Sequence, residues 1–243
     1  MNYLITMKYD GSAYHGWQRQ ENAVTVQQRT EEAVEALFGD KISVSGCSRT
    51  DTGVHANCFK CNFITSKTIP EANIISGLNH FLPEDISVYD CCTVDDGFNA
   101  RFNCKGKEYI YKIYNGRYRD PFYNGRALFY KYPLDETLLN EQAADFIGKY
   151  DFSSFRAVGS TVVTTVRTIT SAEVKREGDL VIFSVSGDGF LYNMVRIMTG
   201  TLIYISEGKI KEGMIPEIIS SKNRLNAGMT APPQGLYLNN VFY

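Results

Sequence analysis

Apolar and polar residues alternate along several short stretches of the first part of the chain, and between these stretches apolar residues recur at helical spacing. A period of two residues is typical of a strand with one buried face, and a spacing of three and four residues is typical of an amphipathic helix. The pattern predicts, in order, a strand at residues 3–9, a helix at 25–38, strands at 42–47 and 58–64, a helix at 70–81 and a strand at 86–94.

The ends of the two predicted helices carry local signals. The hydroxyl of Thr25 can accept a hydrogen bond from the third residue of the helix, and the Gln28 side chain can reach back, which makes a capping box. Gly39 fits the position just past the end of this helix. Pro70 fits the first turn of the second helix, where its missing N–H costs nothing.

The second part of the chain repeats a similar order of elements. Glu177, Gly178 and Asp179 separate two alternating runs and indicate a hairpin. The pattern predicts a strand at residues 109–115, a helix at 135–150, strands at 165–176 and 180–186, a helix at 190–207, a shorter one at 213–221 and a strand at 236–242. Residues 116–133 and 223–234 are expected to be loops.

The order of elements favours an α+β fold. Residues 1–98 read β-α-β-β-α-β, the ferredoxin-like order, and residues 99–243 approximate it a second time. We therefore expect two ferredoxin-like subdomains with these bounds, which form a continuous, mostly antiparallel sheet around a central cleft.

Charge is distributed unevenly along the chain. The formal net charge is −2, which does not favour a nucleic-acid partner. Between residues 100 and 131, however, eight Lys and Arg residues face two acidic ones, so this segment carries 8 − 2 = +6 and the rest −8. Aromatic residues are interleaved with these cations, which suits RNA phosphate contacts and base stacking. A solvated strand and loop with ordinary surface charge explains the segment equally well.

The composition, with 44% apolar and 21% charged residues, is that of an ordinary globular protein. No apolar run approaches the roughly 18–20 residues of a membrane span, and the first residues are too polar for a signal peptide. We expect a cytoplasmic protein with no membrane partner and with its six cysteines as free thiols. Cys58 and Cys61 have the spacing of half a zinc site, but they lack a second pair and would point to opposite faces of a strand, so no metal site is expected.

Residues 47–55 form the densest run of unusual polar residues, and the run lies between two predicted strands. Asp51 is flanked by Arg49 and followed by His55. Three interpretations compete: Asp51 caps a turn, Asp51 and His55 bind a metal, or Asp51 is a nucleophile or general base kept ionised by an arginine. Residue types and spacing alone favour the turn cap.

The run Ser48 to His55 resembles the motif G-R-T-D-A-G-V-H of the TruA-type tRNA pseudouridine synthases. Six further segments resemble motifs of this family, and all seven occur in the family's order. They are residues 9–20 (YDGSAYHGWQRQ), 98–102 (FNARF), 107–111 (KEYIY), 151–156 (DFSSFR), 190–196 (FLYNMVR) and 234–238 (QGLYL). Ser48 and Thr52 depart from the usual Gly and Ala, and neither change removes a reactive group.

The resemblance implies roles for five residues. Asp51 corresponds to the essential aspartate, and Arg196 to an arginine paired with it. Arg49 corresponds to an arginine that helps displace the target nucleotide. Tyr109 corresponds to a tyrosine that stacks on the target base, and Leu236 to an apolar residue of the pocket.

The resemblance also implies an isomerase that converts uridine to pseudouridine in the anticodon stem-loop of tRNA, at positions 38–40. The base must leave its stack, lose its N–C bond to ribose, rotate and rejoin through carbon, so no cofactor or energy source is needed. Whether the aspartate forms a covalent adduct or removes a proton stays open. The resemblance further implies a homodimer and an RNA-binding cleft. Two alternatives are a related enzyme that acts on another tRNA site or on ribosomal RNA, and a non-catalytic RNA-binding protein with the same fold.

Overall fold

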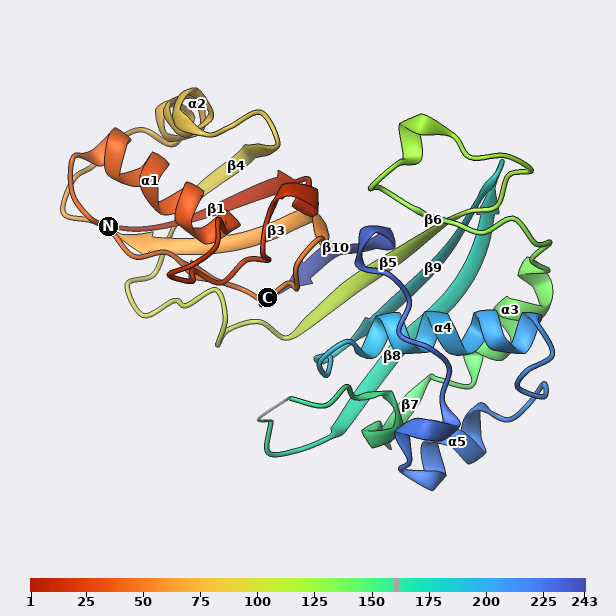
Figure 1. Cartoon of the computed structure of the whole chain (residues 1–243). Coiled ribbons are helices and arrows are strands. Elements are labelled where there is room, and N and C mark those ends of the chain that lie inside the picture. The colour runs from red at the N-terminus through yellow and green to blue at the C-terminus, as the bar shows by residue number, and fades with distance from the viewer. Residues whose placement is uncertain (160–161) are drawn as a thin grey trace. The chain divides into compact units, whose positions relative to one another are not determined.

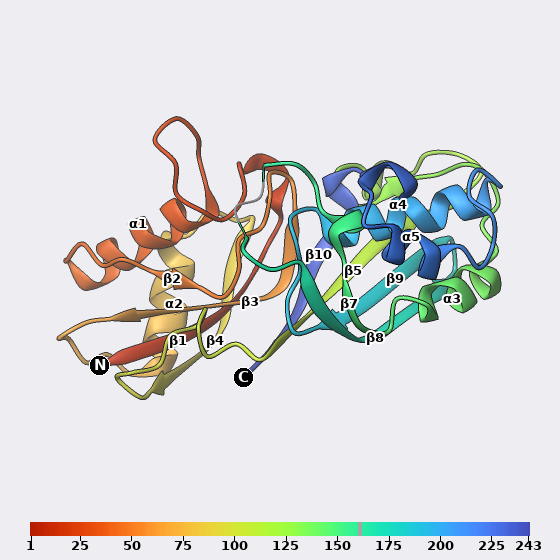
Figure 2. The same ribbon diagram turned by 90° about the horizontal axis from the view of Figure 1, so that it is seen from below.

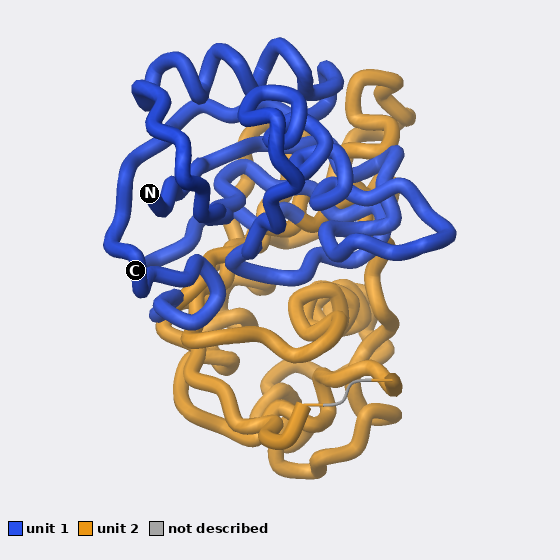
Figure 3. The backbone as a smooth tube through the Cα atoms, turned by 90° about the vertical axis from the view of Figure 1, so that its left-hand side faces the viewer, with its two compact units in different colours: residues 1–105, 237–243 blue, residues 106–236 orange. Residues whose placement is uncertain are grey.

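The computed structural model describes residues 1–159 and 162–243 (Figure 1). The chain forms two compact units (Figure 3). The first comprises Met1–Lys105 together with Tyr237–Tyr243, and the second comprises Gly106–Leu236. Each unit combines helices with a mostly antiparallel set of strands, which confirms the predicted α+β class. None of the described helices combines the length and the apolarity that a membrane crossing needs.

The first unit contains the predicted β-α-β-β-α-β order. β1 (Asn2–Tyr9) lies between β4 (Ile86–Val94) and β3 (His55–Ile64), and it is antiparallel to both. The other edge of β3 is shared by two strands. The short β2 (Ser45–Gly46) pairs antiparallel with one end of β3, and β10 (Leu236–Phe242) pairs parallel with His55 and Ala56 at the other end.

Two helices, α1 (Val26–Phe38) and α2 (Glu71–Phe81), lie next to each other on one face of these strands (Figures 1 and 2). Thr25 caps α1 as predicted, because its hydroxyl accepts a bond from the Gln28 amide at 3.3 Å. The second half of the predicted capping box is wrong: the Gln28 side chain donates to Glu32 one turn further along the helix, at 2.9 Å. A carboxylate four residues away is the nearer partner for an exposed amide.

The second unit is built on four antiparallel strands in the order β5 (Gly106–Tyr114), β9 (Leu180–Gly187), β8 (Val166–Glu177) and β7 (Gly148–Asp151). A two-residue strand, β6 (Leu128–Phe129), runs parallel to the end of β5. The helices of this unit are α3 (Glu136–Ala144), α4 (Met194–Ser206) and α5 (Ile215–Ser221).

Three predicted elements differ from the structure. The helix expected at 135–150 ends at Ala144, and residues 148–151 form β7, because Gly148 has φ +138° and the strand pairs with β8. The helix expected from residue 190 begins at Met194, because Asn193 has φ +61°. The strand expected at 42–47 is reduced to Ser45 and Gly46.

The last strand also lies elsewhere than the sequence suggested. The expected second subdomain covered residues 99–243, whereas residues 99–105 and 237–243 belong to the first unit, where β10 pairs with β3. Sequence order alone cannot reveal this, because a terminal strand can complete any open sheet edge.

Candidate active site

Asp51 lies on the loop of residues 47–54 that connects β2 to β3, which we call the Asp51 loop. Asp51 is half-buried, Arg49 is exposed and Thr50 between them is buried. The carbonyl of Asp51 accepts a bond from the Val54 amide at 3.1 Å. A backbone bond therefore closes this turn.

The segment of residues 9–17 holds the Asp51 loop from one side. The Trp17 amide donates to the Thr50 carbonyl at 3.1 Å, and the Gly53 amide donates to the Tyr14 carbonyl at 3.3 Å. The Tyr9 and Thr50 hydroxyls share a buried hydrogen bond of 2.9 Å. The motif at residues 9–20 thus supports the motif at residues 48–55, and it fixes Thr50, which precedes Asp51.

Gly16 makes this close approach possible. Its φ is +80°, a backbone conformation that residues other than glycine rarely adopt. A Cβ atom at this position would lie 2.3 Å from the Thr50 carbonyl oxygen. The Cβ atom would be attached to the backbone of residue 16 and would meet the backbone of Thr50, so neither group could move away easily.

His55 has a structural place at the start of β3. Its side chain is 1% exposed and stacks on Tyr237 with ring centroids 4.5 Å apart. Its Nδ1 lies 3.0 Å from the Gly11 amide and 3.2 Å from a carboxylate oxygen of Asp10. Both contacts, together with the stacking on Tyr237, fix the orientation of the imidazole ring. Among the described residues, no group of three His, Cys, Asp or Glu side chains is placed to hold a metal ion.

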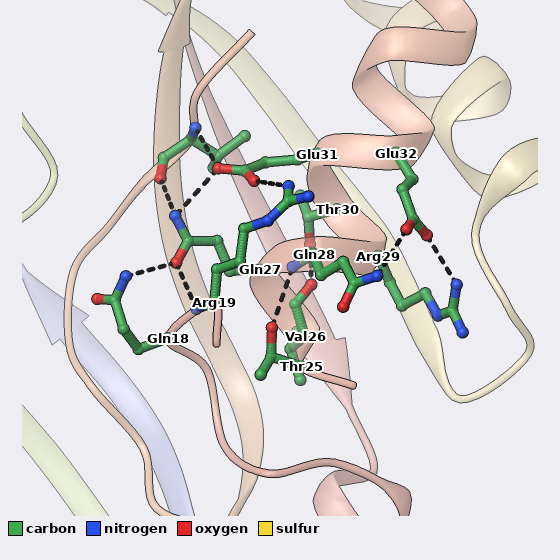
Figure 4. Close-up of polar contacts among 11 residues, drawn as sticks. Gln18, Arg19, Thr25, Val26, Gln27, Gln28, Arg29, Thr30, Glu31 and Glu32 are labelled. Carbon is green, nitrogen blue, oxygen red and sulfur yellow. Dashed lines mark hydrogen bonds and ion pairs between the residues drawn. The ribbon is translucent and has the colours of Figure 1, made fainter. Parts of the chain in front are cut away.

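The side chain of Gln27, in α1, connects residues 18 and 19, which follow the 9–17 segment, to Val44, which directly precedes β2 (Figure 4). Its oxygen accepts bonds from the Arg19 amide and the Gln18 side chain, both at 2.9 Å. Its nitrogen donates to the Val44 carbonyl at 3.1 Å. A single buried amide therefore connects three segments of the first unit.

Arg196 lies in the first turn of α4 in the second unit. Its Nε donates to the Ala231 carbonyl at 2.6 Å and its Nη1 to the Asn193 side chain at 2.7 Å. These bonds fix the plane of the guanidinium. A cation at the positive end of a helix costs about 0.3–1 kcal/mol, which the two hydrogen bonds of the guanidinium offset, and the combined positive charge is suited to an anion.

Tyr109 and Tyr111 point to the same face of β5, because they are two residues apart on a strand. Tyr109 is buried and packs edge to face against Phe190, with centroids 5.1 Å apart. The Tyr111 hydroxyl donates to the Pro232 carbonyl at 2.7 Å. Burial raises the pKa of Tyr111, and the charge of nearby Arg196 acts in the opposite direction.

Leu236 is buried and directly follows a glycine that approaches β5 closely. A Cβ atom on Gly235 would lie 2.6 Å from the Tyr111 ring. The close approach of Gly235 brings the backbone that precedes Leu236 against Tyr111 of β5. The structure thus places Arg49 and Asp51 together in the first unit, and Tyr109, Arg196 and Leu236 together in the second.

Sequence reasoning missed the residues that hold these groups in place. Thr50 and Tyr9 were read only as motif members, and Asn193 and Ala231 were not singled out. Two signals were present: Gly16 within a run of large side chains, and an Asn directly before an apolar helix.

Comparison with known sequences identifies the family. The sequence model of the family described as tRNA pseudouridine synthase matches residues 5–103 and 143–243. The tRNA pseudouridine synthase A of Acetivibrio thermocellus is 46% identical over 242 residues, which cover 100% of this chain and 99% of that protein. The protein of the same name from Clostridium kluyveri is 45% identical over 243 residues, with the same coverage. Tyr109 lies outside the two matched ranges, whereas the other four candidate residues lie inside them.

These matches, together with the α+β units, define the class: an RNA pseudouridine synthase, an isomerase. More particularly, the chain belongs to the tRNA pseudouridine synthase family.

Proposed function

We propose that the chain converts uridine to pseudouridine in tRNA with Asp51 as the reacting carboxylate. The observation that carries the proposal is the way in which the structure holds the Asp51 loop, with the flanking backbone bonded to the 9–17 segment. A group that reacts with an extruded nucleoside must be held in place, because misplacement by about 1 Å costs on the order of 10²-fold in rate.

The reaction rearranges bonds within one nucleotide. The N1–C1′ bond breaks, a C5–C1′ bond forms, the C5 proton is lost and N1 gains a proton, so the product is an isomer. Asp51 acts as nucleophile or base while charge develops on the ribose and the base. No electron acceptor and no outside group enters this balance.

The family resemblance supports roles for the other four candidate residues. Arg196 is the arginine proposed to keep the Asp51 carboxylate ionised, and Arg49 helps to extrude the nucleotide. Extrusion costs about a few kcal/mol, and stacking on Tyr109 offsets about 1–3 kcal/mol of it. Leu236 forms an apolar wall of the pocket.

Uridines at positions 38–40 of the anticodon stem-loop are the proposed targets, and a cytoplasmic homodimer that contacts one tRNA with both subunits is the proposed form. The chain resembles the curated synthases over its whole length, which supports the same substrate. Mapping of pseudouridines in tRNA from cells with and without the gene tests the positions. Loss of modification at another tRNA site or in ribosomal RNA instead would contradict them. Sedimentation of the purified protein tests the dimer.

The decisive experiment is tritium release from tRNA labelled at carbon 5 of uridine. We expect release by the wild type, no measurable release by Asp51→Asn, and nearly unchanged tRNA affinity, since the amide keeps the shape of the carboxylate. Asp96→Asn, which alters an exposed loop carboxylate of the same unit, is the matched control and should keep full activity. Activity should also survive strong chelators. Substantial turnover by Asp51→Asn, or tRNA binding by the wild type without turnover, would disprove the proposal.

A further inference from the structure

Residues Arg117–Tyr132, which we call the 117–132 loop, follow β5 in the second unit. The loop carries four cations and one anion, so its charge is 4 − 1 = +3, while the rest of the chain carries −5. Six of its sixteen residues are aromatic. It lies entirely within residues 104–142, which the family model does not match, so nothing in that match assigns it a role.

The base of the 117–132 loop is firmly held. The side-chain amide of Asn115 donates to the carbonyls of Tyr130 and Tyr132, each at 2.7 Å. The Tyr130 amide donates to the Tyr114 carbonyl at 2.9 Å, and β6 pairs with the end of β5. The loop is therefore an ordered projection of the sheet (Figure 1), and its surface needs little ordering when it binds a partner.

The surface of the loop is aromatic and basic at the same time. Tyr118 is 70% exposed and Phe122 is 85% exposed. Arginine and lysine side chains lie over aromatic rings in three pairs: Arg117 with Tyr118 at 5.2 Å, Arg119 with Phe129 at 5.8 Å, and Lys131 with Tyr132 at 5.0 Å. Exposed aromatic rings mark a surface that another flat apolar group can cover favourably. The cations beside these rings attract an anionic partner.

A hollow of about 530 Å³ is lined mainly by residues of the loop. Tyr114 and Tyr123 stack on each other at its wall, with centroids 4.8 Å apart. Its lining also includes Arg119, Pro121, Phe129 and Gln234. Volumes of about 300–1,000 Å³ are typical of sites for small molecules, so a flat ring system has room here.

We propose that the 117–132 loop is a second RNA contact, which binds unpaired nucleotides of the substrate outside the catalytic pocket. Bases stack on its aromatic faces and phosphates pair with its arginines. Paired bases present no open face, so the loop selects a single-stranded part of the RNA. Tyr109 and Tyr114 are five residues apart on β5, about 17 Å, so the loop contacts nucleotides other than the target. This inference rests on the proposed function, because it takes the same RNA as ligand.

A second copy of the chain fits the loop less well. A two-fold interface would bring the same patch against itself, and each patch carries +3. Like charges across an interface are repulsive, whereas a phosphate backbone neutralises them.

The test compares two sets of exposed residues in the second unit. The loop variant combines Arg117→Ala, Arg119→Ala and Phe122→Ala. The control variant combines Lys211→Ala and Leu225→Ala, which are also exposed but lie outside the loop. Turnover of labelled tRNA and filter binding are measured for the wild type and both variants at several salt concentrations. Oligoadenylate, which contains no uridine to convert, serves as the single-stranded competitor.

We expect the loop variant to raise KM at least about tenfold with kcat nearly unchanged. The slope of log affinity against log salt should fall by about 1.4–1.8 for two lost phosphate contacts. Oligoadenylate should compete with tRNA on the wild type and far less on the loop variant. Equal KM and salt slope in all three proteins, no competition by oligoadenylate, or loss of self-association by the loop variant without loss of RNA affinity would overturn the inference. An inactive wild type would instead overturn the proposed function.

Discussion

The two groups of candidate residues are held in place in different ways. Asp51 lies on a loop, and its neighbours are fixed by individual hydrogen bonds to another loop. Arg196 lies on α4, of which ten residues are buried. A loop that depends on a few bonds can lose its geometry through one substitution, whereas a helix with a buried face keeps its backbone when one side chain changes. Activity should therefore be sensitive to substitutions that move the backbone of the Asp51 loop in the first unit. In the second unit it should be sensitive to substitutions that change a side chain of α4.

The largest effect is expected from Gly16→Ala. The new Cβ atom would overlap the Thr50 carbonyl, and φ would be strained as well. We expect kcat to fall at least about 100-fold and the free energy of unfolding to fall by about 2–4 kcal/mol. Urea unfolding and turnover of labelled tRNA measure these quantities.

Gly208→Ala separates the two causes. Gly208 also has a positive φ, +69°, but nothing lies within 4 Å of its Cβ position. It should lose only about 1 kcal/mol of stability and keep its kcat. Equal losses in the two variants would show that backbone strain, and not the approach to Thr50, is the cause.

The next largest effect is expected from Arg196→Lys. The ammonium keeps the charge but cannot hold Ala231 and Asn193 with the fixed geometry of a guanidinium. We expect a loss of about 10²-fold in kcat with α4 intact, as measured by circular dichroism and turnover.

Arg176→Lys is the matched control, because Arg176 also bonds with its guanidinium to several oxygens, those of Glu136, Asn115 and Leu134, in the same unit. This variant should lose stability and keep its kcat. A similar drop in kcat for both variants would mean that loss of any multiply bonded guanidinium disturbs the second unit.

A smaller effect is expected when the Tyr9–Thr50 bond is removed. Tyr9→Phe and Thr50→Val each remove this buried hydrogen bond and should cost about 1–2 kcal/mol. The double variant should lose less than the sum, because both partners are then gone. Urea unfolding of the four proteins gives the coupling, and strict additivity would show that the 2.9 Å contact contributes nothing.

The smallest effect is expected at Asp151, whose carboxylate bonds to Ser153, Thr165 and Lys222 in the second unit. Bonds from Ser153 and Thr165, and the Lys222 ammonium, hold the pKa of Asp151 below its usual value of 3.8. Because the folded pKa is lowered, the carboxylate stabilises the fold above about pH 4 and loses this contribution as the pH falls below it. Asp151→Asn should therefore be less stable than the wild type at pH 7, and the difference should shrink towards pH 2. A difference that does not depend on pH would contradict this.

Much of the first unit could be predicted from its sequence, because its signals are local. The alternation of residues 86–94 and the Thr25 cap each determine an element within a few residues. The helix predicted at 135–150 was too long, because Gly148 and the pairing of β7 with β8 override the apolar spacing after Ala144. Such pairing depends on residues far along the chain and leaves no local pattern.

The candidate site shows the same limit. The family resemblance drew attention to Asp51, Arg49, Tyr109, Arg196 and Leu236, whose roles stay predictions. The bonds that hold their surroundings, such as Tyr9 with Thr50, connect positions about 40 residues apart in sequence. No periodicity reports such a bond, so only the folded chain reveals it.

The pairing of β10 with β3 has a consequence for biosynthesis. His55 lies opposite Tyr237, so 237 − 55 = 182 residues separate the two partners. A ribosome adds about 5–20 residues per second, so the strand that carries Tyr237 emerges roughly 9–36 seconds after His55. During this interval one face of the buried imidazole lacks its stacking ring. The nascent chain therefore cannot complete the sheet edge beside the Asp51 loop until the whole second unit has been synthesised.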